Sequence, residues 1–365
     1  MSTPRSLAFL HADLAALDAS AARRTRRRRV GEGLVDLSSN DYLGLARGIE
    51  ARTGRFGAGA SRLVSGDTAE HEELERSIAS WLGLGDALVF SSGYAANVGT
   101  ISALVGPGDL VVSDALNHAS IIDGCRLSRA RVAIVPHLAV EAIEQALRST
   151  PHRRALVVTE SWFSMDADSP DLATLRAVCD DAGAMFMVDE AHALGVFGPE
   201  GRGLCAAAGV LPDVFVGTFG KAFGGAGAFV AGSDALLDWL WNRARSFVFS
   251  TGLPPVVART LADRLGHLRS ADRDRERLAE LSRRVRSAVP AHRPARGHGP
   301  IVPITCGGND DALAAQEFLR ERGLWVAAIR PPTVPENDAR LRLTLSAHLE
   351  ERVVVSLEAA LRCLP

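Results

Sequence analysis

The strongest constraint on the fold is a series of seven short apolar runs, most of them separated by longer amphipathic stretches. Stretches such as AEHEELERSIASWLG and DLATLRAVCDDAG have the apolar spacing that is typical of helices. Strands that alternate with helices indicate a mainly parallel sheet with both faces covered. The runs are ALVFS from 87, LVVSD from 110, RVAIV from 131, ALVVTE from 155, MFMVDE from 185, VFVGTF from 214 and AFVAG from 228. We therefore expect an α/β fold in which these runs are buried strands.

The character of the sequence changes after STGLPP, which ends at residue 255. An arginine-rich amphipathic stretch is followed by a segment rich in proline, glycine and histidine, and then by the strand-like IVPIT and RLRLTLS. A chain of 365 residues with 47% hydrophobic residues suffices for about two domains. We expect an N-terminal helical segment over 1–36, a large domain over 37–255 and a small α+β domain over 256–365.

Charge and cysteine content narrow the class of protein. The net charge of −2 gives no reason to expect nucleic acid or a membrane surface as a partner, so small-molecule chemistry is favoured. Five scattered cysteines without a C-x-x-C pair indicate neither disulfides nor a metal site. Asp13 and Asp18 argue against a targeting peptide, and no apolar run reaches membrane-spanning length. We expect a cytoplasmic protein.

Lys221, in GTFGKAFGGAGAF, is the only lysine among 41 basic residues. A guanidinium stays protonated, whereas an ε-amine can lose its proton, attack a carbonyl and form a Schiff base. Lys221 is therefore predicted to be a nucleophile. The alternative is an ordinary surface lysine.

Other polar residues stand where the predicted strands end, which is where open α/β sheets bind ligands. MFMVDEAHALG ends a strand with Asp189, Glu190 and His192, and SDALNHAS places His118 at a further strand-to-helix junction. FSSGYAANVG opens a helix at Gly93, whose free N–H groups could seat a phosphate. Each feature alone has a structural explanation: a plain connection, or a histidine satisfied in the core.

The tetrapeptide DEAH also occurs in nucleic-acid helicases, beside a phosphate loop that ends in Gly-Lys-Ser/Thr. Such a loop is excluded here because the only lysine is followed by Ala222. The combination of a lysine, a strand-end acid, two histidines and a phosphate seat instead matches what pyridoxal 5'-phosphate requires.

The ordered motifs resemble those of the α-oxoamine synthases, pyridoxal 5'-phosphate enzymes of fold type I, over almost the whole chain. The motifs are LSSNDYLGL, SRLVSG, FSSGYAANVG, NHASIIDG, TESWFSMDAD, VDEAHALGVFG, GTFGKAFGG and FSTGLPP. The resemblance implies that Lys221 forms the Schiff base with the cofactor and that Asp189 pairs with its pyridinium nitrogen. It also implies that His192 hydrogen-bonds the ring oxygen and that His118 stacks on the ring.

The resemblance further implies how the cofactor phosphate is held. Its ligands would be the N–H groups of Gly93 and Tyr94, the hydroxyls of Ser164 and Thr218, and Thr251 from a neighbouring subunit. A homodimer is therefore expected.

For the substrate, the resemblance implies that Arg342 binds the amino acid carboxylate, with Asn40 nearby. An arginine of RRTRRRR (23–29), such as Arg26, would also reach the site. The alternatives are an exposed strand charge at 342 and a solvated helix end at 23–29.

The tail VAAIRPPTVPENDARLRLTLSAH favours the family member of biotin biosynthesis, which condenses L-alanine with a pimeloyl thioester and releases CO2. The thiol carrier, coenzyme A or an acyl carrier protein, stays open. A member that uses glycine is the main alternative, and a non-catalytic regulator that binds pyridoxal 5'-phosphate is a remote one. The segment over 45–61 is shorter than the family pattern, which leaves the acyl-chain and dimer geometry there open.

Overall fold

The computed structural model describes residues 9–21, 23, 33–46 and 53–365. Contacts between Cα atoms divide the chain into two compact units. The first consists of Met1–Ser39, Met165–Ala167 and Leu278–Pro365, and the second of Asn40–Ser164 and Asp168–Arg277.

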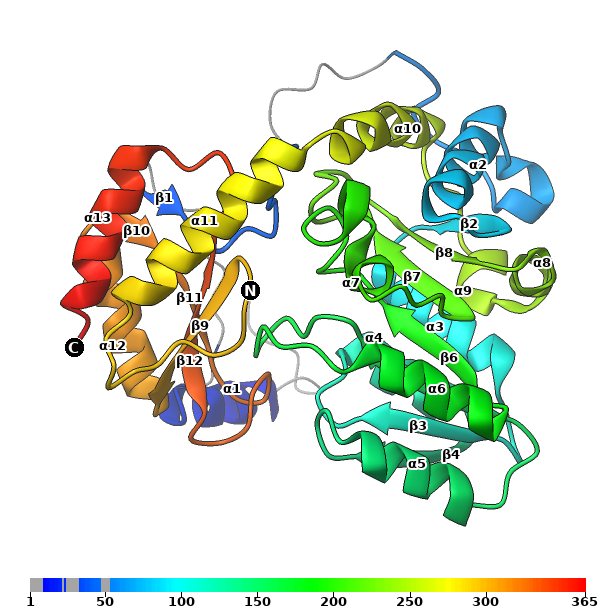
Figure 1. The fold of residues 1–365 in the computed structure, drawn as a ribbon, viewed down its shortest axis with the longest axis horizontal. Helices are drawn as coiled ribbons and strands as arrows, with labels where there is room; N and C mark the ends of the chain where they lie inside the picture. The colour runs from blue at the N-terminus through cyan, green and yellow to red at the C-terminus, as the bar shows by residue number, and fades with distance from the viewer. Residues whose placement is uncertain (1–8, 22, 24–32, 47–52) are drawn as a thin grey trace. The chain divides into compact units, whose positions relative to one another are not determined.

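The second unit is built on a seven-stranded sheet with the order β2-β8-β7-β6-β5-β3-β4 (Figure 1). Its strands are β2 Asp86–Phe90, β3 Leu110–Asp114, β4 Arg131–Val135, β5 Ala155–Glu160, β6 Met185–Asp189, β7 Val214–Thr218 and β8 Ala228–Gly232. Every apolar run predicted to be a strand is confirmed as one. β8 is antiparallel to both its neighbours, and the other pairs are parallel.

Most of these strands are buried on both faces, which explains their continuous apolar sequences. On one face Leu88, Leu156 and Val216 belong to a core cluster with side chains from α3, α4 and α8. Phe186 and Phe215 alternate with these positions along their strands and are also buried. The sheet therefore has side chains packed on both sides.

The prediction that all seven runs are buried is wrong for β4. Ile134 is 71% exposed, Val132 is exposed as well, and only Val135 is buried. The reason is the cover on each edge of the sheet: β2, at one edge, is buried under α2 and α8, whereas β4, at the other edge, has α5 against it and stays largely exposed.

The helices of the second unit include the two predicted from their spacing, α2 and α6. Their bounds are α2 Ala69–Leu82, α3 Gly93–Leu104, α4 Ala119–Ser128, α5 Val140–Ser149, α6 Leu172–Ala182, α7 Gly203–Ala207, α8 Asp234–Arg243, α9 Arg245–Val248 and α10 Pro255–Arg269, with a π-helical turn over Arg62–Gly66 and a 3-10 turn over Pro199–Gly201. Polar caps fix several starting points: Ser92 accepts the N–H of Ala95 at α3, and Asp171 accepts that of Thr174 at α6.

The first unit contains a three-stranded antiparallel sheet, β11-β12-β9, that includes both strand-like segments of the tail. Its strands are β9 Ile301–Gly307, β11 Ala327–Ile329 and β12 Ala339–Thr344; β1 Val35–Asp36 pairs separately with β10 Leu324–Trp325. Its helices are α1 Phe9–Ala19, α12 Asn309–Arg320 and α13 Glu351–Arg362, and α11 Asp272–Ala288 crosses the boundary between the units.

The compact units do not follow the predicted segments, so the three-domain division stays a prediction. Helix α10, which we expected to begin the small domain, packs against α2 and lies within the second unit. Among the described residues, no helix is long and apolar enough to cross a membrane.

Candidate active site

Three neighbouring strands of the large sheet end in buried acidic residues. Asp114 ends β3, Glu160 ends β5 and Asp189 ends β6, and these strands are adjacent in the sheet. Glu160 and Asp189 are direct register partners. The parallel strands thus bring a row of carboxyl groups to one edge.

Asp189 is held by two hydrogen-bond donors. Its Oδ1 accepts the main-chain N–H of Ala191 at 2.8 Å, and its Oδ2 accepts Nδ2 of Asn97 at 2.7 Å. Asn97 lies on α3, four residues after the helix begins at Gly93. The two donated bonds fix the orientation of the carboxylate.

His118 caps the N-terminus of α4 and lies close to Asp189 and Lys221. Its main-chain N–H donates to Oε1 of Glu160 at 2.7 Å, and its Nδ1 lies 2.8 Å from the Ser120 hydroxyl. Burial lowers the pKa of His118; the charge of Asp189 raises it and that of Lys221 lowers it further. The imidazole is therefore biased toward its neutral form.

Lys221 lies in the connection between β7 and β8, where its carbonyl accepts the N–H of Gly224 at 2.7 Å. Its charge also acts on Glu160. Burial and the charge of Asp189 raise the pKa of Glu160 to about 8, although Lys221 opposes the shift. The structure thus brings together Lys221, Asp189 and His118, which the sequence analysis selected from three separate motifs.

His192 is buried just after β6, and its Nδ1 lies 2.8 Å from the hydroxyl of Tyr42. Tyr42 and Trp162 both meet the imidazole edge-on, at interplanar angles of 64° and 77°, with ring centroids 6.4 Å away. The Tyr42 hydroxyl and the aromatic rings of Tyr42 and Trp162 therefore help to hold the imidazole in place. Its predicted bond to the cofactor stays a prediction.

The predicted phosphate seat combines a helix N-terminus with a hydroxyl. A Cβ added at Gly93 would lie 3.9 Å from Oγ1 of Thr218, so the first turn of α3 adjoins the end of β7. Oγ1 of Thr218 also accepts the N–H of Gly220 at 3.2 Å. The side chain of Tyr94 is 48% exposed and donates to Asp123, so its main-chain N–H is the group left for the seat.

Glu190, the acid next to Asp189, has a structural role. Its carboxylate accepts the Ser161 hydroxyl at 2.7 Å and the main-chain N–H groups of Leu204 and Cys205 at 3.1 and 2.6 Å. Gly203 has a φ of +90°, and a Cβ there would lie 2.3 Å from Oε2 of Glu190. Only glycine therefore fits where this carboxylate fixes the start of α7.

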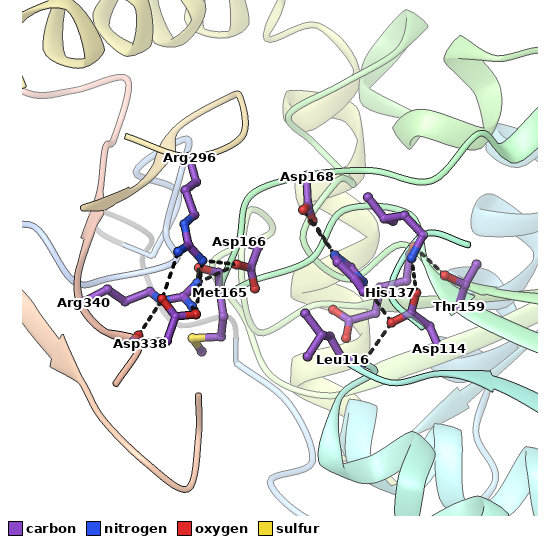
Figure 2. A network of polar contacts seen from close by, with 12 residues as sticks. Asp114, Leu116, His137, Thr159, Met165, Asp166, Asp168, Arg296, Asp338 and Arg340 are labelled. Carbon is purple, nitrogen blue, oxygen red and sulfur yellow. Dashed lines mark hydrogen bonds and ion pairs between the residues drawn. The ribbon is translucent and has the colours of Figure 1, made fainter. Parts of the chain in front are cut away.

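A charged network anchors the loops beside the site (Figure 2). The ring of His137 bridges Asp114, at 2.9 Å from Nδ1, and Asp168, at 3.2 Å from Nε2. Phe163 packs edge-on against this ring at 4.5 Å. Burial alone would lower the pKa of His137, but hydrogen bonds to the two carboxylates and their charges raise it to about 10. We call His137 with its two carboxylate partners, Asp114 and Asp168, the His137 clamp. His118 lies four residues after Asp114, so the clamp fixes the position of the segment that carries His118.

A second network lies within the first unit (Figure 2). The fully buried Arg340 donates to the carbonyl of Met165 at 2.8 Å and to Asp166 at 2.7 Å, and also pairs with Asp338. Arg296 contacts both of these carboxylates. These bonds explain why the short Met165–Ala167 segment groups with β12 rather than with the residues on either side of it.

The remaining predicted residues have mixed outcomes. Arg342 is buried on β12 and donates to Oγ1 of Thr344 at 3.1 Å, so the alternative of an exposed strand charge is wrong. Oδ1 of Asn40 accepts the Tyr42 hydroxyl at 3.3 Å. Arg342 and Asn40 belong to different units, and their proximity stays a prediction.

Three further residues were predicted to contact the cofactor phosphate or the substrate. Ser164 is half-buried and Thr251 is exposed. Arg26 lies outside the described residues.

Sequence reasoning missed several residues that shape the site. Three of them, Glu160, Asn97 and Tyr42, lie inside motifs that carry the family resemblance. Their position in these motifs is the sequence signal that could have identified them. His137 follows a strand as a lone histidine, and nothing near it in the sequence announces its two carboxylate partners.

The model of the aminotransferase class I and II family matches residues 32–359. The chain therefore belongs to this family, and within it to the α-oxoamine synthases that its motifs resemble.

Individual relatives narrow the similarity. The 8-amino-7-oxononanoate synthase of Aromatoleum aromaticum is 46% identical over 362 residues, which cover 93% of each chain. Among solved structures, Sphingomonas wittichii serine palmitoyltransferase is 30% identical with a TM-score of 0.88 and covers 100% of this chain and 99% of its own. The 8-amino-7-oxononanoate synthase of Francisella tularensis is 26% identical with a TM-score of 0.76, covering 91% and 96%. The predicted fold class is confirmed.

Proposed function

We propose that the protein is a pyridoxal 5'-phosphate-dependent acyltransferase of biotin biosynthesis. It condenses L-alanine with a pimeloyl thioester and gives 8-amino-7-oxononanoate, CO2 and a free thiol. The observation that carries this proposal is the 46% identity, over nearly the full length, to a relative named 8-amino-7-oxononanoate synthase. The convergence of Lys221, Asp189 and His118 at one sheet edge supports it.

The side chains present fit the cofactor. Lys221 offers the amine that would hold the cofactor aldehyde covalently, and the buried, doubly hydrogen-bonded Asp189 offers a charge for the pyridinium nitrogen. His192 would bind the ring oxygen, and His118 would lie against the ring. Pyridoxal 5'-phosphate, when bound, supplies an electron sink for negative charge at the substrate Cα.

The phosphate would sit at the N-terminus of α3. The N–H groups of Gly93 and Tyr94 lie in its first turn, beside the hydroxyl of Thr218. Anions bind at such ends because the free N–H groups and the helix dipole favour negative charge. Ser164 would add a hydroxyl.

In the reaction, the chain's own groups move and hold protons. The amine of Lys221 would take the Cα proton of alanine and later return one. Asp189, as an anion, would keep the pyridine nitrogen protonated throughout. His118 would donate a hydrogen bond from its ring to the carbonyl oxygen of the thioester, where charge develops during attack. The burial of Asp189 and Glu160 excludes water and strengthens these interactions.

Substrate binding would use Arg342, whose planar guanidinium can bind the alanine carboxylate with two hydrogen bonds. Asn40 and Arg26 would complete that region. The cofactor phosphate would also receive Thr251 from a second copy of the chain, which makes the working form a homodimer. We place the enzyme in the cytoplasm, with either coenzyme A or an acyl carrier protein as the thiol carrier.

A steady-state comparison of substrate pairs tests this function. Purified enzyme with added cofactor is assayed with alanine plus pimeloyl-CoA or pimeloyl-acyl carrier protein, glycine plus acetyl-CoA or succinyl-CoA, and serine plus palmitoyl-CoA. We expect the alanine pair to give the highest kcat/KM. A tenfold or greater preference for a glycine pair would replace the biotin assignment with the glycine alternative. Absence of turnover with every pair, despite bound cofactor, would favour a non-catalytic regulator.

A further inference from the structure

A continuous chain of hydrogen bonds connects Asp189 to His118. Nδ2 of Asn97 donates to Oδ2 of Asp189 at 2.7 Å and to Oγ of Ser120 at 3.0 Å. Oγ of Ser120 in turn lies 2.8 Å from Nδ1 of His118. The path therefore links Asp189, which is proposed to face the pyridine nitrogen of the cofactor, with His118, which is proposed to face the acyl carbonyl of the substrate.

The orientation of the Asn97 amide follows from its surroundings. Asn97 is 1% exposed, and an ionised Asp189 can only accept hydrogen bonds, so the NH2 group must face it. Within the described part of the chain, Oδ1 of Asn97 has no hydrogen-bond partner. The amide is thus held by its two donated bonds alone, which is unusual for a buried polar group.

The direction of each later bond is then determined. Because Asn97 donates to Oγ of Ser120, the single hydroxyl hydrogen of Ser120 is available for Nδ1 of His118. The main-chain N–H of Ser120 also points at this nitrogen, at 3.2 Å. Nδ1 therefore accepts two bonds and carries no hydrogen. A neutral imidazole has one N–H, and here it must be on Nε2.

We propose that Asn97 is a positioning residue that holds the Asp189 carboxylate and, through Ser120, keeps the ring proton of His118 on Nε2. Its role in the reaction rests on the proposed function, in which Nε2–H donates to the acyl carbonyl. The lowered pKa of His118 agrees with a neutral ring at the pH of the assay.

The chain offers a matched control. Thr100 lies on the same helix, is fully buried, and its hydroxyl makes no hydrogen bond within the described residues. Thr100→Val thus changes a buried polar side chain of α3 without touching the path. There are two test variants. Asn97→Leu removes both donated hydrogen bonds. Asn97→Asp places an acceptor at position 97, so that the Ser120 hydroxyl can donate to it and the hydrogen bond between these two residues reverses its direction.

The first measurement is the tautomer of His118 from long-range 15N–1H NMR of the cofactor-free protein at pH 8. We expect Nε2–H in the wild type and in Thr100→Val. In Asn97→Leu the ratio of Nε2–H to Nδ1–H should fall about fivefold, the effect of one lost hydrogen bond, and it should fall further in Asn97→Asp. A wild-type ring protonated on Nδ1, or a ratio within twofold of the wild type in both Asn97 variants, would overturn the proposal.

The second measurement is the condensation assay with cofactor saturating. Asn97→Leu should lower kcat about 10- to 100-fold with little change in KM, as expected when a supporting hydrogen bond of a catalytic group is removed, while Thr100→Val stays within twofold. A kcat for Asn97→Leu equal to that of Thr100→Val would contradict the positioning role. Because the NMR arm needs neither cofactor nor substrate, failure of the proposed function would show only as missing wild-type turnover.

Discussion

The clamp around His137 makes a pH-dependent contribution to stability that a single substitution can isolate. His137→Gln keeps a polar side chain between Asp114 and Asp168 but cannot carry a positive charge. The two carboxylates are then left close to each other without the cation that both contact in the wild type. We expect the variant to be less stable at neutral pH, because charges removed from water need a partner.

The magnitude follows from the pKa of His137. Folding raises it from 6.5 to about 10. One pKa unit corresponds to about 1.4 kcal/mol, so the charged ring contributes about 5 kcal/mol. Because the folded pKa is the higher one, the contribution is fully present below pH 6.5 and is lost as the pH rises through about 10. Between these limits the difference in unfolding free energy between wild type and variant should shrink by about 1.4 kcal/mol per pH unit.

Urea unfolding of both proteins at pH 6, 7, 8, 9 and about 10 measures this difference. Other groups titrate in the same range, but they are common to both proteins and cancel in the comparison. A difference that stays constant from pH 6 to about 10 would refute the assignment of a charged, doubly paired His137. A difference that grows with pH would mean that folding lowers the pKa of His137 instead of raising it.

Three further predictions concern the site and its support. Lys221→Arg should keep the fold and the charge but abolish covalent cofactor binding; visible absorbance of the purified protein reports this, and an arginine variant that still binds covalently would contradict the nucleophile assignment. Asp189→Asn should still bind cofactor but slow the exchange of the alanine α-deuteron by orders of magnitude, as followed by NMR, and unchanged exchange would remove the proposed role of its charge. Glu75→Gln should lower the unfolding free energy by about 3 kcal/mol. The reason is that buried Glu75 pairs with buried Arg62 and accepts the N–H of Val89 at 2.7 Å; an unchanged urea midpoint would show that the pair contributes nothing net.

The strands of the large sheet could be predicted because burial on both faces leaves a direct mark on the sequence. The same reasoning failed at β4, whose apolar residues resemble those of its neighbours although they are exposed at an edge that helices cover less than they cover β2. Edge position depends on strand order, and strand order depends on packing between distant segments. The antiparallel direction of β8 could not be predicted either, because it also depends on how distant segments pack together.

Within the candidate site, residues with distinctive chemistry could be predicted and those that support them could not. Lys221 stood out because no other lysine accompanies it, and Asp189 because it ends an apolar run. Asn97 is one polar residue within a helix, and its importance depends on Asp189 and Ser120, which are far away in the sequence. Only folding brings these three side chains together.

The pairing of β1 with β10 has a consequence for the order in which the protein can fold as it leaves the ribosome. Val35 and Asp36 are synthesised early, but their partners Leu324 and Trp325 emerge almost three hundred residues later. The large sheet needs only strands between Asp86 and Gly232, so it can form while the end of the chain is still being translated. A nascent chain arrested after α10 would therefore contain every strand of the large sheet. Its β1 strand, however, would still be without β10, the partner strand that had not yet been synthesised.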